Sequence, residues 1–150
     1  MGKTAILAVT AILTASSSSG AIAGQPNSND PVHCIAAYFY AHQILLKGPE
    51  PDRPHALGMS ARMVFESIRL KRAGKFAGAF AQAEAFLKEH VRDQQAMMSL
   101  LKNCGTKLDA NSDYQAGIRD GSLISLAEKL EQRQAASLAQ GQSRGSVKLP

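Results

Sequence analysis

Four stretches of the chain repeat apolar side chains every three or four residues, which is the spacing of one face of an α-helix. They lie at about 30–47, 54–73, 76–103 and 122–140. Strict alternation of apolar and polar residues, the pattern of a half-buried strand, is not a feature of these stretches. The pattern therefore predicts an all-α fold, a small bundle of about four helices.

The ends of these stretches carry residues that commonly start and stop helices. Asp30 suits the N-cap of the first helix, and Pro31 suits its first position, where the missing N–H costs nothing. Gly74 follows the second stretch, as expected for a helix C-terminus. The third stretch is the longest, and its most polar part, residues 91–94, is a candidate break.

Residues 105–121 are rich in Asp, Asn, Ser and Gly, and we predict a loop there. Oxygen-bearing side chains occupy positions 1, 3, 5 and 12 of a potential calcium loop: Asp109, Asn111, Asp113 and Asp120. Such a loop needs Gly at position 6, where this chain has Tyr114, and its last ligand is usually the longer Glu. We therefore interpret the segment as an Asp/Asn turn and predict no metal site.

The first 23 residues have the pattern of a cleavable secretory signal peptide. Lys3 precedes an uncharged, mostly apolar run at residues 5–13, which is too short to span a bilayer as a helix. Small residues at 21 and 23 predict cleavage before Gly24. We expect a periplasmic or secreted protein without a membrane span after cleavage, made of a helical domain at 24–140 and a flexible tail at 141–150.

The chain has two cysteines, Cys34 and Cys104. An even pair in an oxidising compartment normally forms a disulfide, and there is no Cys-x-x-Cys motif to indicate a redox function. The predicted bond joins the first turn of the first helix to the end of the third. Because it closes a long loop, the chain-entropy model gives roughly 4 kcal/mol of stabilisation.

The distribution of charge and the absence of known motifs disfavour several classes of function. The chain has 17 Lys and Arg against 12 Asp and Glu, and the two signs are interleaved, which disfavours a nucleic-acid partner. The four histidines form no pair on one helix face, and no nucleophile elbow or phosphate-binding glycine loop is present. We therefore predict no cofactor and no catalytic residue, although carboxylates from distant positions could still form a pair.

Three consecutive aromatic residues lie in the first predicted helix: Tyr38, Phe39 and Tyr40. Consecutive side chains point around a helix, so these three cannot all be buried. Tyr38 and Tyr40 are therefore our first candidates for contact with a partner. The alternative is that Tyr38 and Phe39 are buried while Tyr40 covers a groove between helices.

Arg69, Lys71 and Arg72 lie in the last turn of the second predicted helix. Cations at the negative end of a helix dipole are the simplest explanation of this cluster. The alternative is a basic patch for an anionic partner, which makes Arg69 and Arg72 our second pair of candidate contacts.

These features together favour a non-enzymatic protein of the bacterial periplasm whose partner is another envelope protein. An inhibitor, an immunity-type neutraliser and a stress chaperone all fit this description. The bacterial origin is inferred from the short, Ala-rich signal and from the lack of Asn-x-Ser/Thr glycosylation sites. Two alternatives stay open, a small-ligand or metal-binding envelope protein and an unrecognised envelope enzyme.

Overall fold

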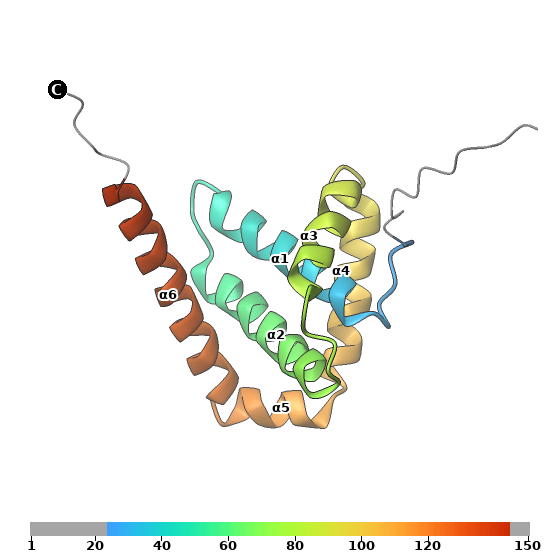
Figure 1. Ribbon diagram of the computed structural model, residues 1–150. Coiled ribbons are helices and arrows are strands. Elements are labelled where there is room, and N and C mark those ends of the chain that lie inside the picture. Colours follow the sequence, from blue (N-terminus) through green and yellow to red (C-terminus); the bar gives the residue numbers. More distant parts are fainter. Residues whose placement is uncertain (1–23, 145–150) are drawn as a thin grey trace, which may run out of the picture.

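The computed structural model describes residues 24–144, and the described chain consists of six α-helices without a strand (Figure 1). The helices are α1 (Pro31–Lys47), α2 (Arg53–Arg72), α3 (Ala79–His90), α4 (Gln94–Asp109), α5 (Ser112–Arg119) and α6 (Ser122–Arg144). The predicted all-α class is confirmed, but the number of helices is six and not about four. The predicted signal peptide, 1–23, and the tail residues 145–150 lie outside the described residues.

The third predicted helix is two helices, because the chain breaks at 91–93 within its most polar stretch. The side chain of Asp93 accepts a hydrogen bond from the N–H of Ala96 at 2.9 Å and so caps the start of α4. A second cap lies before α3, where Gly78 has φ +76°. That left-handed backbone favours glycine, and it starts the helix at Ala79, three residues later than predicted.

The predicted loop at 105–121 is wrong, because this segment is mainly helical. α4 continues to Asp109, and α5 follows after two residues. The Asn111 carboxamide oxygen accepts hydrogen bonds from the N–H groups of Asp113 and Tyr114, both at 3.0 Å. The residues that suggested a calcium loop therefore belong to helix ends and caps. The short α5 is held by the buried ring of Tyr114, which makes an edge contact with Phe65.

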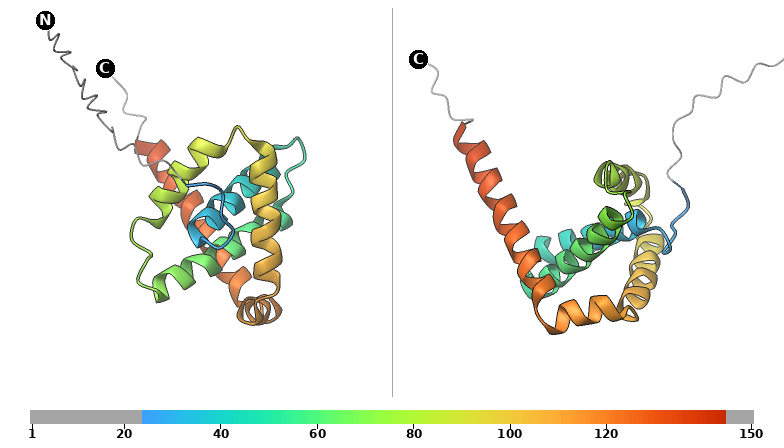
Figure 2. Two further views of the ribbon diagram at one scale, coloured as in Figure 1. Left: turned by 90° about the vertical axis from the view of Figure 1, so that its right-hand side faces the viewer. Right: turned by 60° about the horizontal axis from the view of Figure 1, so that its bottom comes forward.

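α1 is the central helix, and it packs against α2, α3 and α4 (Figure 2). Its residues 34–38 are all buried, because its first half is covered on several sides. The predicted disulfide is present between Cys34 on α1 and Cys104 on α4, with a Cα–Cα distance of 5.6 Å. No helix of the described chain has the length and apolar character needed to cross a membrane.

α6 packs against α2 through its first turns, where Leu123 and Ala127 are buried. The side chains from 132 to 140 are all exposed, and Leu138 is 70% exposed. Figure 1 shows this second half of α6 leaving the body of the molecule. The helix continues to Arg144, four residues past its predicted end.

Candidate functional site

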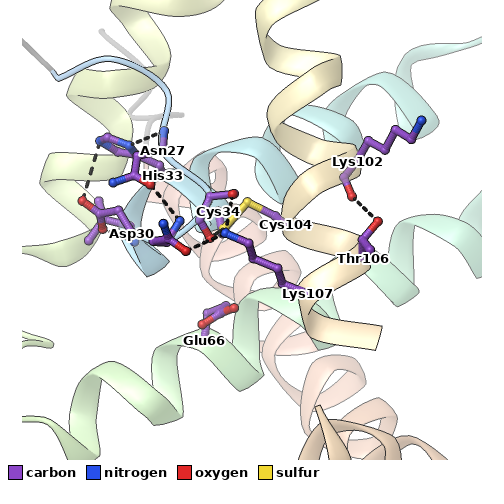
Figure 3. The surroundings of a disulfide bond; sticks show 12 residues. Asn27, Asp30, His33, Cys34, Glu66, Lys102, Cys104, Thr106 and Lys107 are labelled. Atoms are coloured by element: carbon purple, nitrogen blue, oxygen red, sulfur yellow. Dashed lines mark hydrogen bonds and ion pairs between the residues drawn. A yellow bond between two sulfur atoms is a disulfide. The ribbon is translucent and has the colours of Figure 1, made fainter. Parts of the chain in front are cut away.

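The leader, residues 24–30, folds back onto the helices beside the disulfide (Figure 3). The N–H of Asn27 donates to Nδ1 of His33 at 3.2 Å. Lys107 Nζ, from α4, donates to Ser28 Oγ at 2.7 Å and also to the carboxamide oxygen of Asn29. The leader thus forms a wall beside the start of α1.

The ring of His33 belongs to a stack that supports this wall. Phe86 lies between His33, with ring centroids 4.0 Å apart, and His90, at 4.2 Å. Burial lowers the pKa of His33, with a further decrease from His90 and an opposing effect of Asp30. A neutral His33 ring leaves Nδ1 free to accept the hydrogen bond from the leader.

An open cavity of about 970 Å³ lies between the leader and the C-terminal end of α2, and we call it the leader cavity. Its polar and charged lining residues are Asn27, Asn29, Asp30, Arg69, Arg72, Lys75 and Gln82. Three of these side chains are cations and one is an anion. The carboxylate of Asp30 already caps α1, since its Oδ1 accepts from the N–H of Val32 at 2.9 Å. The cavity therefore has an excess of positive charge.

The three cations of the leader cavity differ in their surroundings. Arg69 pairs with Glu66 through an Nη1–Oε2 distance of 2.9 Å. Arg72 and Lys75 are exposed, and neither forms an ion pair with a carboxylate within residues 24–144. Their charges are therefore available to a binding partner.

Helix termination does not require these cations. The last carbonyl groups of α2 already accept backbone hydrogen bonds, from Ala73 to Arg69 at 3.0 Å, from Gly74 to Lys71 at 3.1 Å and from Lys75 to Leu70 at 2.9 Å. Lys71 shares the last turn but does not line the cavity, although a helix dipole would attract all of these cations. The lining of the cavity thus favours the basic patch that the sequence left as an alternative.

A smaller hollow of about 180 Å³ adjoins the leader cavity and shares Asn29, Pro31 and Arg69 with it. The disulfide and Glu66 lie on its wall, and Figure 3 shows Glu66 on the same side of the disulfide as Lys107. Glu66 is only 4% exposed. Burial raises the pKa of its carboxyl group, and Arg69 opposes that rise.

We expect Glu66→Gln to raise the melting temperature by a few degrees at pH 7. Because the pKa of this carboxyl group is higher in the folded than in the unfolded chain, its ionisation destabilises the fold as pH rises. The increase in melting temperature should therefore become smaller at pH values below the ordinary pKa of Glu, where the carboxyl group is protonated in the folded and the unfolded chain. Thermal unfolding from pH 4 to 7 measures this effect.

The control for this change is Glu84→Gln. Glu84 is exposed and forms a surface ion pair with Lys88, so its replacement should change the melting temperature little. A lower melting temperature of the Glu66→Gln protein at pH 7 would show that the ion pair with Arg69 outweighs the cost of burying the carboxylate.

A second polar cluster joins α6 to α1 and α2. Glu131 Oε1 accepts a hydrogen bond from Ser60 Oγ at 2.6 Å and lies 3.0 Å from Nε2 of His42. In a Ser–His–carboxylate catalyst the serine hydroxyl bonds to the histidine, whereas here the carboxylate stands between the two. His90 does not belong to this cluster, because it lies in the ring stack beside Phe86. This geometry holds helices together and does not activate Ser60.

The structure argues against Tyr38 as a contact residue, because Tyr38 is 0% exposed in the described chain. Tyr40 is partly buried, and the aromatic residue that reaches the surface is Phe39, 44% exposed. The alternative interpretation is correct for Tyr38, which is buried, and wrong for Phe39, which is exposed. A central helix covered by three neighbours has no single buried stripe, so helical spacing could not assign these residues.

The structure brings Arg69 and Arg72 together at one cavity, but it places Tyr38 and Tyr40 away from its lining. Sequence reasoning did not select Lys75 or the leader as part of a site. Lys75 is one residue past the glycine that ends α2, and the leader has no apolar pattern.

Within residues 24–144 no group of three or more His, Cys, Asp or Glu side chains could hold a metal ion.

Comparisons with protein-family models, with curated proteins and with solved structures find no match to this chain. The functional interpretation therefore depends on the leader cavity and on the chemistry of its lining.

Proposed function

We propose that this chain is an exported, non-enzymatic binding protein that holds another envelope protein at the leader cavity. The observation that carries the proposal is the pair of exposed cations, Arg72 and Lys75, on the wall of an open cavity of about 970 Å³. Charged groups with complementary partners increase the rate and the specificity of protein association.

Two further features support a binding role outside the cytoplasm. Structural disulfides persist in oxidising compartments, and the Cys34–Cys104 bond lies beside the leader. The walls of the cavity are held by Lys107 on one side and by the Glu66–Arg69 pair on the other. A site that is ordered before binding loses less conformational entropy when a partner arrives.

The volume of the leader cavity favours a second candidate function, the binding of a small ligand. About 970 Å³ lies at the upper end of the roughly 300–1,000 Å³ that is typical of small-molecule pockets. The lining of this cavity is mainly polar and charged, whereas most such pockets are predominantly apolar. We therefore place the protein partner first.

Affinity capture tests the proposal. The oxidised protein is immobilised, envelope extract of the source organism is passed over it, and retained proteins are identified by mass spectrometry. We expect one dominant protein that is lost with the double change Arg72→Gln and Lys75→Gln, and retained with the control Lys71→Gln. A spread of unfolded proteins would indicate a chaperone, and an empty column would contradict a protein partner.

A further inference from the structure

We infer that the leader cavity accepts an acidic segment of a protein chain, whose carboxylates pair with Arg72 and Lys75. This inference rests on the proposed function and names the chemistry of its partner. Three observations carry it: the unpaired cations, the amide side chains on the opposite wall, and the buried carboxyl group of Glu66 at one end.

Arg72 and Lys75 recognise carboxylates in complementary ways. The planar guanidinium of Arg72 can form two parallel hydrogen bonds to one carboxylate. The ammonium of Lys75 is a compact charge that accepts a range of approach directions. Since both side chains are exposed on one wall, two acidic side chains of one segment can be held together.

The leader supplies hydrogen-bond donors for the backbone of such a segment. The carboxamide oxygen of Asn27 accepts from the N–H of Asn29, and the carboxamide oxygen of Asn29 accepts from Lys107. The amide NH₂ groups of both side chains have no acceptor within residues 24–144. Because both residues line the cavity, these groups are placed to donate to backbone carbonyls or to a carboxylate.

The position of Glu66 indicates at which end of the cavity the acidic residues bind. Its buried carboxyl group lies in the smaller hollow that continues from the leader cavity past Arg69. An ionised acid entering that hollow would meet the Glu66 carboxyl group. The two cations there, Arg69 and Lys107, already bond to Glu66 and to the leader, so they are less available to a partner than Arg72 and Lys75. The acidic residues of the partner therefore belong at the Arg72 and Lys75 end.

The spacing of the cations favours a chain over a compact anion. Arg69, Arg72 and Lys75 follow one another at intervals of three residues along the end of α2 and beyond it, and only two of them are unpaired. A phosphate ion is bound most strongly by donors that converge on one point, as in a glycine-rich loop. Separate cations on an open wall suit separate carboxylates.

Fluorescence anisotropy with a labelled hexaglutamate peptide and the oxidised full protein tests the inference. We expect saturable binding that weakens as salt is added. Arg72→Gln and Lys75→Gln should each weaken binding by about fivefold, the upper range for an exposed ion pair. The control Lys71→Gln, which removes the same charge outside the cavity, should leave binding unchanged. Hexaglutamine and hexalysine peptides should not bind.

Several outcomes would overturn the inference. They are a lack of saturable hexaglutamate binding, an equal loss with Lys71→Gln, and displacement of the peptide by inorganic phosphate at concentrations matched to the peptide. A captured partner that depends on Arg72 and Lys75 but has no acidic segment would overturn the inference and leave the proposed function intact. Hexaglutamate binding together with an empty capture column would support the acid preference and contradict the proposed function.

Discussion

Removing the Cys34–Cys104 disulfide is expected to lower the free energy of unfolding by about 4 kcal/mol. The bond joins residues separated by 70 positions, and its loss lets the unfolded chain gain the conformational entropy of a long loop. A small domain has only about 5–15 kcal/mol of stability, so the change is a large part of the total. Urea unfolding of the protein with Cys34→Ala and Cys104→Ala, compared with the oxidised parent, measures it.

Reduction of the parent protein provides the control for the two substitutions. Dithiothreitol should destabilise the parent by a similar amount and leave the double Ala protein unchanged. Because the leader lies beside the disulfide, we also expect hexaglutamate binding to weaken when the bond is lost. An equal urea midpoint for the parent and the double Ala protein would mean that helix packing alone holds α1 against α4.

Tyr38→Ala should destabilise the fold by about 3–5 kcal/mol, which is typical of removing a buried aromatic ring. Tyr38 is fully buried, and its ring packs in the core beside the guanidinium of Arg62, 5.8 Å from the ring centroid. Burial raises the pKa of its hydroxyl group, which stays protonated. Urea unfolding followed by circular dichroism measures the loss.

Tyr38→Phe distinguishes the packing of the Tyr38 ring from a contact between its hydroxyl group and a partner. Within the described residues the Tyr38 hydroxyl has no hydrogen-bond partner, so its removal should change stability by less than about 1 kcal/mol. The Phe protein should also capture the same partner as the parent. A Phe protein that is as unstable as the Ala protein would show that the hydroxyl and Arg62 interact in solution, and a folded Phe protein that loses the partner would restore Tyr38 as a contact.

Residues near the helix ends were enough to predict where α1 begins and where α2 ends. Asp30 and Pro31 predicted the start of α1, and Asp30 caps it as expected. Gly74, with φ +68°, follows the end of α2. Caps depend on a few neighbouring residues, so they can be read without the rest of the fold. The disulfide could be predicted as well, because the sequence has two cysteines and each has one possible partner.

The short helix α5 could not be predicted from local pattern. Its eight residues are too few to be stable as an isolated helix, and Asp, Asn, Ser and Gly in the surrounding segment favour turns. Tyr114 stabilises it through tertiary contact with Phe65. The same limit applies to Tyr38 and Phe39, whose burial depends on which neighbours cover the two halves of α1.

The sequence by itself determined the helical class, the disulfide and a cluster of cations near Arg69 and Arg72. The helical class and the cation cluster follow from residues close in the chain, and the disulfide follows from the presence of two cysteines. Only the tertiary structure decided that the cations line a cavity. That cavity exists because Lys107 and His33 hold the leader opposite the end of α2. Lys107 and Ser28 are 79 positions apart, and a hydrogen bond between residues so distant leaves no periodic pattern in the sequence.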